Sequence, residues 1–246
     1  MSRKFGLIGF PLGHSFSEVF FTEKFTREGI DASYSLYPLG NINQLNQLMI
    51  ATPELSGFNV TIPYKEKVIA FLDEVSKEAK EIGAVNVVKI TEKKGKKILS
   101  GYNTDYIGFS ESLSPLLPPG ILNALVLGTG GASKAIAFAL KKLGIKPILV
   151  SRRPEEGEIG YEDLMDDIIA KNLLIVNTTP LGMFPNIESC PPIPYHLLTE
   201  QHICYDLVYN PEMTKFMIKS KKQGATVKNG LEMLHRQAEE AWKIWK

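Results

Sequence analysis

Three glycines in the second half of the chain have the spacing of a phosphate-binding turn. Gly128, Gly130 and Gly131 lie between an apolar stretch, residues 123–127, and a helical pattern, residues 134–143. The first glycine permits a tight turn, the second lets the backbone approach a pyrophosphate, and the helix N-terminus supplies free N–H groups and a positive dipole. Ser133 stands where the usual fingerprint has a third glycine. The pattern favours a dinucleotide site of relaxed form over an ordinary strand-to-helix turn.

The residues after the next expected strand indicate which dinucleotide would bind. A site for NAD usually places Asp or Glu about 20 residues beyond the glycines, where it accepts a hydrogen bond from the ribose 2′-hydroxyl. This chain has Ser151, Arg152 and Arg153 there. Because two guanidinium groups and a hydroxyl suit a 2′-phosphate, the sequence predicts NADP. The alternative is a solvated arginine pair that neighbours Glu155 and Glu156.

The first half of the chain places polar residues at expected helix starts. Ser15 and Ser17 precede a helical pattern that ends at Gly29, and a helix N-terminus favours a carboxylate. One serine could cap this helix while the other binds an anion, so the two interpretations do not exclude each other. Lys65 follows Pro63 and is expected in the first turn of a helix, where the dipole disfavours a cation. On composition alone, it would be one more surface lysine.

An alternation of short β-branched stretches and longer helical patterns positions these residues, and it is typical of parallel α/β proteins. Strands are expected at residues 5–10, 34–38, 58–62, 84–90, 97–102, 123–127, 146–151, 173–177 and 203–209. Helices are expected at residues 15–29, 43–50, from residue 63, 134–143, 161–171, 213–222 and 230–245. The strands at 84–90 and 97–102 are expected to pair as a hairpin with an exposed lysine-rich tip.

Composition narrows the class of protein. The chain has 246 residues, 44% hydrophobic and 22% charged, which suits one large domain or two small ones and excludes overall disorder. A net charge of +1 gives no electrostatic footprint for nucleic acid or an anionic membrane. No apolar run reaches the roughly 18 residues of a membrane span, and the N-terminus lacks a signal-peptide pattern. Cys190 and Cys204 lack metal-ligand spacing. We expect a cytoplasmic protein with no metal, nucleic-acid partner or membrane partner.

Several segments, taken in order along the chain, resemble motifs of one family. They are Gly9-Phe10-Pro11-Leu12-Gly13-His14-Ser15-Phe16-Ser17, Phe58-Asn59-Val60-Thr61-Ile62-Pro63-Tyr64-Lys65, Gly83-Ala84-Val85-Asn86, Gly101-Tyr102-Asn103-Thr104-Asp105, Gly128-Thr129-Gly130-Gly131-Ala132-Ser133, Asn177-Thr178-Thr179-Pro180-Leu181-Gly182-Met183, Tyr205-Asp206-Leu207-Val208-Tyr209-Asn210-Pro211 and Gly230-Leu231-Glu232-Met233-Leu234-His235-Arg236-Gln237-Ala238. Together they resemble the shikimate dehydrogenase family over essentially the whole chain. The segment that ends at Lys65 is the most specific.

The resemblance implies a fold and an activity. The activity is the reversible, NADPH-dependent reduction of 3-dehydroshikimate to shikimate, a step towards chorismate and the aromatic amino acids. The implied fold is two-domain α/β, with an N-terminal α/β substrate-binding and catalytic domain, residues 1–105 with 230–246. A Rossmann-like NADP-binding domain, residues 106–229, follows. The active site would lie in the cleft, and the C-terminal helix would return to the first domain.

The resemblance also implies the residues of the site. Lys65 would donate or accept the proton, and Asp105 would orient it and contact the reacting hydroxyl. The substrate carboxylate and ring hydroxyls would be bound by Ser15, Ser17, Thr61, Lys65, Asn86, Asp105, Tyr209 and Gln237. The cofactor would be bound by Gly128, Gly130, Gly131, Ala132, Ser151, Arg152, Arg153, Thr178 and Gly230. Without the resemblance, Asn86 and Gln237 would be equally suited to core hydrogen bonding.

One segment departs from the family pattern. Between Arg153 and Lys171 the family usually carries a helix, a strand and part of a second helix, whereas this chain has one helical pattern at residues 161–171. We therefore expect a dinucleotide domain trimmed by about one βα unit, with a weaker hold on NADP. The alternatives are a quinate/shikimate dehydrogenase of broader substrate and cofactor use, and a non-catalytic NADP-binding sensor. The chain is expected to act as a monomer or homodimer.

Overall fold

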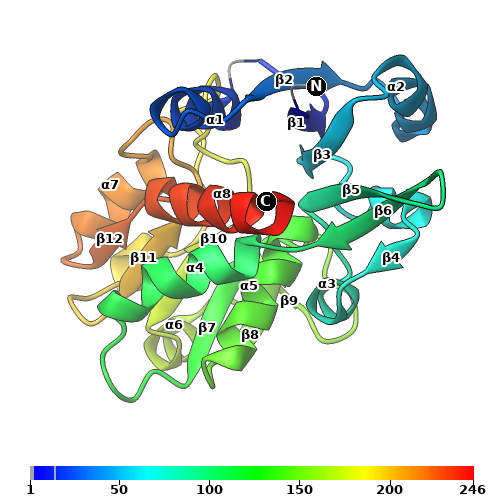
Figure 1. Cartoon of the computed structure of the whole chain (residues 1–246). Helices are drawn as coiled ribbons and strands as arrows, with labels where there is room; N and C mark the ends of the chain where they lie inside the picture. The colour runs from blue at the N-terminus through cyan, green and yellow to red at the C-terminus, as the bar shows by residue number, and fades with distance from the viewer. Residues whose placement is uncertain (1–2, 14) are drawn as a thin grey trace. The chain divides into compact units, whose positions relative to one another are not determined.

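The computed structural model describes residues 3–13 and 15–246, and its chain divides into two compact units. The first unit ends at Thr104 and also contains Ala238–Lys246, and the second is Asp105–Gln237 (Figure 1). Residues 230–237, expected with the substrate domain, thus group with the second unit by compactness. The functional domains, residues 1–105 with 230–246 and residues 106–229, stay a prediction.

A six-stranded sheet, formed by described residues before Thr104, is the frame of the first unit. Its strands are β1 (Arg3–Gly9), β2 (Ala32–Pro38), β3 (Leu55–Val60), β4 (Glu74–Val75), β5 (Val87–Lys93) and β6 (Lys96–Tyr102), in the order β2-β1-β3-β5-β6-β4. β1, β2 and β3 are parallel, whereas β5 is antiparallel to both β3 and β6. The carboxyl ends of β1, β3 and β6 and the start of β5 therefore lie at one edge of the sheet.

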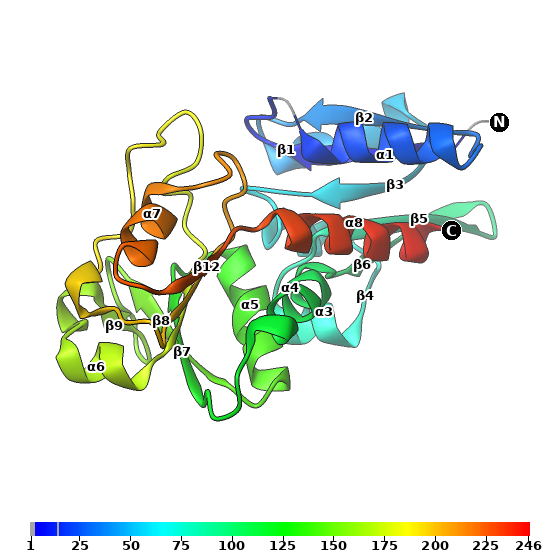
Figure 2. The same ribbon diagram turned by 90° about the vertical axis from the view of Figure 1, so that its left-hand side faces the viewer.

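Alternating side chains of these strands build a hydrophobic core on each face of the sheet. The helices are α1 (Phe16–Arg27), α2 (Leu45–Ala51), α3 (Lys77–Ile82) and the C-terminal α8 (Leu231–Trp245). Ile8 packs with residues of α2 and α3, while Phe5 packs with Phe21 of α1 and with Trp245. Figure 2 shows α1 lying along β1 and β2. The Trp245 indole N–H donates to the Val88 carbonyl at 3.0 Å, which joins the end of α8 to this unit.

The second unit has a parallel sheet, six-stranded over the part of the chain that the structure describes. Its strands are β7 (Asn123–Leu127), β8 (Lys146–Ser151), β9 (Ile159–Gly160), β10 (Leu174–Asn177), β11 (Ile203–Asp206) and β12 (Thr226–Lys228). The order β9-β8-β7-β10-β11-β12 is that of a doubly wound dinucleotide-binding fold, numbered 3-2-1-4-5-6. The predicted Rossmann-like architecture is confirmed.

Helices cover both faces of this parallel sheet, as its strands require. They are α4 (Asp105–Leu113), α5 (Gly131–Lys142), α6 (Asp166–Lys171) and α7 (Lys215–Lys221). α4, α5 and Met233 of α8 pack on the face of Val126, whereas α6 and α7 pack on the face of Leu125. The first half of α8 therefore belongs to this unit and the second half to the other, so the predicted return of the C-terminal helix is confirmed.

The trimmed segment keeps more of the usual unit than the sequence predicts. A short strand, β9, survives and pairs with β8, while residues 152–158 connect the two as an irregular loop. The single helix expected at residues 161–171 is also wrong. It is split into a 3₁₀ turn, Tyr161–Asp163, and α6, because Leu164 leaves helical geometry with a ψ of 72° and is buried in the core.

The helix expected to begin at Pro63 is absent, and this changes the surroundings of Lys65. Residues 62–66 form turns, and a 3₁₀ helix occupies Lys67–Phe71. The buried Tyr64 donates its hydroxyl to the Leu39 carbonyl, and the Lys65 carbonyl accepts from the Val85 N–H at 2.8 Å. That carbonyl is held by a neighbouring segment, so the dipole of an α-helix does not act on Lys65 as the sequence suggested.

Candidate active site

Five of the predicted substrate residues flank the same edge of the first sheet. Ser15 and Ser17 follow β1, Thr61 follows β3, and Asn86 precedes β5. Backbone hydrogen bonds hold these segments together, because the Thr61 N–H donates to the Ile8 carbonyl and the Val60 N–H to the Asn86 carbonyl, both at 2.9 Å. The bond from Val85 to Lys65 adds the lysine segment to this edge.

The two serines have different surroundings. Ser15 is the N-cap of α1, with φ −113° and ψ 129°, and its hydroxyl accepts from the Ser17 N–H at 3.2 Å. Ser17 is buried, and its hydroxyl interacts with the phenol of Tyr34. Burial raises the pKa of Tyr34 well above its usual value, so the phenol remains a neutral donor. Ser15 therefore has the capping role considered from the sequence, whereas Ser17 is attached to the core.

Asn86 makes the core hydrogen bonds that the sequence left open. Its Oδ1 accepts from the Thr104 N–H at 2.7 Å, and its Nδ2 donates to the Thr104 hydroxyl at 3.0 Å. Its carbonyl accepts from Asn59 Nδ2 at 3.3 Å, and Asn59 Oδ1 accepts from Tyr34 at 2.8 Å. This buried network fixes the backbone of Thr104, which directly precedes Asp105 in the chain. A positioning role does not exclude the predicted substrate contact.

In the second unit, α4 and α8, which carry Asp105 and Gln237, meet at Gly108. A Cβ added at Gly108 would lie only 2.6 Å from the Met233 carbonyl and 3.1 Å from Gln237 Cβ, so the two helices meet where Gly108 has no side chain. Asp105 lies one turn before Gly108 on the same face of α4. Both Asp105 and Gln237 are buried, and Gln237 Nε2 donates to the Leu234 carbonyl at 3.0 Å.

The glycine turn lies at the carboxyl edge of the parallel sheet, where doubly wound folds bind nucleotides. Gly128 has a φ of 112°, and a Cβ there would lie 2.8 Å from the Thr178 hydroxyl oxygen. Gly130 is the N-cap of α5, and no atom lies within 4 Å of an added Cβ there. Ser133 is buried and donates to the Gly130 carbonyl at 2.5 Å, so it substitutes for the third glycine without occupying the turn. Gly131 and Ala132 open α5.

The next strand end carries the predicted cofactor-selective residues. Ser151 ends β8, and its hydroxyl donates to the Arg153 carbonyl at 3.1 Å and accepts from the Arg153 N–H at 3.2 Å. Arg152 and Arg153 are exposed, and neither forms an ion pair with the described residues. The charge of Arg152 opposes the rise that burial causes in the pKa of Tyr161, so it acts on that side chain. Glu155 and Glu156 do not pair with the arginines.

Asp206 lies beside predicted site residues, and the sequence argument did not single it out although it lies in a quoted motif. The side chain is fully buried at the end of β11 beside Asn177, its partner in the register of β10. Three residues predicted to bind cofactor or substrate are near this pair. Thr178 and Tyr209 are close to it in the chain, and Gly230 is linked to the same segment because its N–H donates to the Val208 carbonyl at 3.3 Å. The signal that could have identified Asp206 is an Asp at the carboxyl end of a buried parallel strand.

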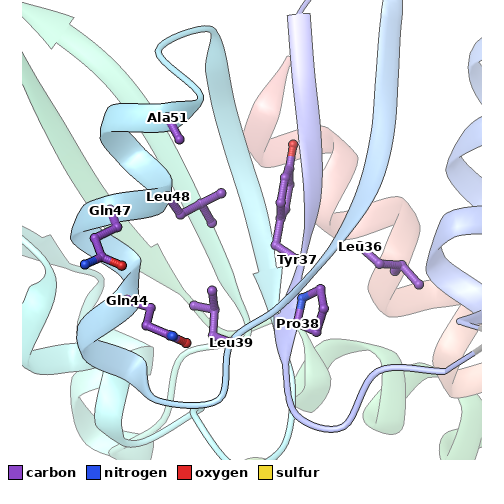
Figure 3. Close-up of a pocket in the computed structure, with 8 residues that line it drawn as sticks. All are labelled: Leu36, Tyr37, Pro38, Leu39, Gln44, Gln47, Leu48 and Ala51. Carbon is purple, nitrogen blue, oxygen red and sulfur yellow. The ribbon is translucent and has the colours of Figure 1, made fainter.

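One measurable pocket lies away from all these residues. It has a volume of about 350 Å³ between β2 and α2, and Figure 3 shows Leu48 pointing towards Tyr37 across it. The described residues that line this pocket are apolar except for Tyr37, Gln44 and Gln47, and none of them is a predicted substrate or cofactor residue. The described residues also contain no cluster of metal ligands, and none of their helices is long and apolar enough to cross a membrane.

A doubly wound sheet with a glycine turn, joined to a second α/β unit with a polar edge, is typical of a nicotinamide-dependent dehydrogenase. Residues 7–88 match the shikimate dehydrogenase substrate binding domain. The chain is 37% identical to shikimate dehydrogenase (NADP(+)) of Caldicellulosiruptor saccharolyticus, with 99% of this chain and 92% of the relative covered. It belongs to the shikimate dehydrogenase family.

Solved structures support the same relationship. The shikimate dehydrogenase of Aquifex aeolicus superimposes with a TM-score of 0.87 at 38% identity, covering 100% of this chain and 92% of that one. The enzyme of Thermus thermophilus, solved in complex with NADP(H) and shikimate, gives 0.85 at 33% identity, with coverage of 99% and 93%. The trimmed segment therefore lies within an otherwise complete family fold.

Proposed function

We propose that this protein catalyses the reversible, NADP-dependent reduction of 3-dehydroshikimate to shikimate. The observation that carries the proposal is the similarity of 99% of the chain to an NADP-dependent shikimate dehydrogenase, together with Lys65 and Asp105 in the matching motifs. The enzyme is an oxidoreductase acting on a secondary alcohol. Its substrate is a small ring that bears a carboxylate and several hydroxyls.

The substrate is held by the residues that the family motifs supply in this proposal. Ser15 donates its hydroxyl to the carboxylate while a lone pair of the same oxygen still accepts the capping N–H. Ser17 donates to the carboxylate after its hydroxyl turns away from the Tyr34 phenol. The ring hydroxyls are bound by Thr61, Asn86, Asp105, Tyr209 and Gln237. Asn86, Asp105 and Gln237 are buried, which supports this assignment. A buried polar group costs more binding free energy than an exposed one when the ring hydroxyl that matches it is missing.

Lys65 is assigned the proton transfer. When bound, NADPH supplies the hydride that reduces the carbonyl carbon. The carbonyl oxygen then gains negative charge, and Lys65 donates a proton to it, with Asp105 orienting the ammonium group and contacting the same hydroxyl. In the reverse direction, Lys65 accepts the hydroxyl proton. The Val85 bond to the Lys65 carbonyl fixes the lysine backbone at the sheet edge, so only the side chain has to reach the substrate.

The residues of the parallel sheet fit a dinucleotide phosphate. The turn at Gly128 is closed against Thr178, the space over Gly130 is open, and α5 directs its first N–H groups towards that space. In this proposal, the cofactor phosphates lie against the backbone of Gly131, Ala132 and Gly230. The 2′-phosphate is bound by Ser151, Arg152 and Arg153. The two exposed guanidinium groups have no carboxylate partner among the described residues, which leaves them available for an anion.

The proposal extends to the location and the acting form of the protein. We assign a cytoplasmic location, which the two free thiols, Cys190 and Cys204, support because disulfides are rare in a reducing compartment. We assign the monomer or homodimer as the acting form, with a small molecule as its only partner and neither nucleic acid nor membrane involved. Sedimentation velocity of the purified chain distinguishes monomer from dimer.

A single steady-state assay tests the activity. Oxidation of shikimate and of quinate is followed with NADP and with NAD at saturating concentrations, and we expect the highest kcat/KM for shikimate with NADP. Comparable rates with quinate or NAD would identify a quinate/shikimate dehydrogenase instead. NADP binding without turnover of either substrate would identify the cofactor-binding sensor and refute the proposal.

A further inference from the structure

We propose that Asp206 is a positioning residue whose buried carboxylate holds the loops after β10 and β11 in place for cofactor and substrate. The inference rests on the proposed function, because those loops carry Thr178 and Tyr209. Asp206 itself ends β11 and is fully buried, so it acts through its neighbours rather than by contact with either ligand.

The carboxylate is matched by three donors from three segments. Its Oδ1 accepts from Asn177 Nδ2 at 2.9 Å and from the Val208 N–H at 3.0 Å. Its Oδ2 accepts from the Thr214 hydroxyl at 2.6 Å, and Thr214 caps α7. One side chain therefore ties together the end of β10, the turn after β11 and the start of a helix.

A first branch leads from this carboxylate to the glycine turn. Asn177 Oδ1 accepts from the Thr179 N–H at 3.0 Å and from its hydroxyl at 2.7 Å. Thr179 Cγ2 in turn would lie 3.2 Å from a Cβ at Gly128. The loop after β10 thus closes directly on the turn that binds the phosphates, and Asp206 fixes the orientation of the Asn177 amide that holds it there.

A second branch leads to the loop after β11. The Val208 N–H is bound by Asp206, and the Val208 carbonyl accepts from the Gly230 N–H at 3.3 Å. The Leu207 N–H donates to the Asn177 carbonyl at 2.9 Å. Tyr209 follows directly, so its backbone is anchored on the preceding two residues.

Asp206 is an ionised acceptor at neutral pH despite its burial. Desolvation raises its pKa to about 6, and the hydrogen bonds from Thr214, Val208 and Asn177 oppose that rise. The titratable groups that interact with it are Tyr195 and Cys204, whose own pKa values burial raises, that of Cys204 to about 12. Both are neutral near pH 7, and no described cation shifts the pKa of Asp206, so the partners of the carboxylate are the three donors.

Two substitutions at position 206 separate positioning from charge. D206A leaves all three donors without their acceptor. D206N keeps the shape, because its carbonyl can accept from Asn177 and Val208 while its amide donates to the Thr214 hydroxyl. We expect D206A to lower kcat/KM for NADP by at least about tenfold, the effect of a buried donor left unsatisfied. We expect D206N to restore it to within about threefold of wild type.

A matched control separates positioning from stability. Cys204 lies two residues earlier on β11 and is fully buried, so C204A weakens the same strand without touching the hydrogen bonds of Asp206. We expect C204A to lower the melting temperature and leave kcat/KM unchanged when the protein is assayed fully folded. Unchanged kinetic constants in folded D206A would overturn the proposal, and so would a D206N as impaired as D206A.

A second variant covers the case in which D206A does not fold. T179V leaves Asp206 with all its partners, and it removes the hydroxyl bond to Asn177 together with the acceptor of the Leu181 N–H, both of which belong to the loop after β10. We expect a raised KM for NADP with kcat nearly unchanged, and wild-type KM would contradict the first branch. Calorimetric titration with NADP gives the same comparison without turnover. A wild-type protein that binds NADP but leaves shikimate unchanged would refute the proposed function while the binding defect of D206A still tests the positioning role.

Discussion

Exchanging the two arginines after β8 for glutamine gives the most direct test of cofactor choice. In the proposed complex, Arg152 and Arg153 contact the 2′-phosphate that distinguishes NADP from NAD. Both guanidinium groups are exposed and lack ion pairs with the described residues, so R152Q/R153Q breaks no internal contact that supports the fold. Any loss should therefore appear in cofactor binding rather than in stability.

The magnitude follows from the exposure of the pair. A charge-assisted hydrogen bond is worth ~1.5–3 kcal/mol when well enclosed, which is roughly ten- to a hundredfold in affinity. The irregular loop of residues 152–158 leaves these groups open to solvent, which screens them. We therefore expect the lower limit, a fall of about tenfold in the NADP-to-NAD ratio of kcat/KM.

The assay measures that ratio for wild type and R152Q/R153Q at one fixed ionic strength with saturating shikimate. K221Q/K222Q is the matched control, because it removes the same charge from two adjacent exposed lysines of the same unit that form no ion pair with the described residues. The control should keep the wild-type ratio. An unchanged NADP-to-NAD ratio in R152Q/R153Q would refute the reasoning and show that the arginines do not contact the cofactor. An equal fall of the ratio in both variants would show that net charge, and not a specific contact, causes the effect.

Three further outcomes are expected. K65A should lower kcat by about 10²–10⁴ with KM for shikimate changed only a few-fold, since a general acid acts on the transition state, and near-normal turnover removes Lys65 from the chemistry. S15A should lower the free energy of unfolding by ~1 kcal/mol through the lost cap, and both S15A and S17A should raise KM for shikimate about tenfold; urea titrations and steady-state rates check these effects, and a wild-type KM in both variants contradicts the assignment. Because burial raises the pKa of Asp206 to about 6 from 3.8, its contribution to stability is full well below pH 3.8 and is lost as the pH rises through 6. The free energy of unfolding of D206N should therefore gain about 2 kcal/mol on wild type between pH 4 and 7.5, and a pH-independent difference in urea midpoints would contradict this.

Four of the six strands that the structure describes in the parallel sheet could be predicted from the sequence. β7 and β8 begin and end at the predicted residues, because each is a short apolar stretch followed by glycine or a polar turn, and such a strand is buried on both faces. The glycine turn followed for the same local reason. β9 and β12 escaped prediction, since strands of two and three residues carry no periodicity and form only because a neighbouring strand offers hydrogen bonds.

Lys65 shows where local reasoning fails. Pro63 marks a common helix start, yet the carbonyl of Lys65 bonds to Val85, and Tyr64 is anchored at Leu39. These partners lie about 20 or more residues away in the chain, so no window of sequence around Pro63 contains them. Tertiary contacts overrode a correct local preference.

The sequence by itself determined which side chains are available for chemistry, because motif and residue type are local properties. Tertiary structure alone decided how those side chains are held. Asn177 meets Asp206 only because β10 and β11 pair in that register, and Asn86 meets Thr104 only because the hairpin of β5 and β6 closes beside β3. A shift of one residue would turn each side chain to the opposite face of its sheet, which is why these partnerships depend on strand pairing and not on the motifs themselves.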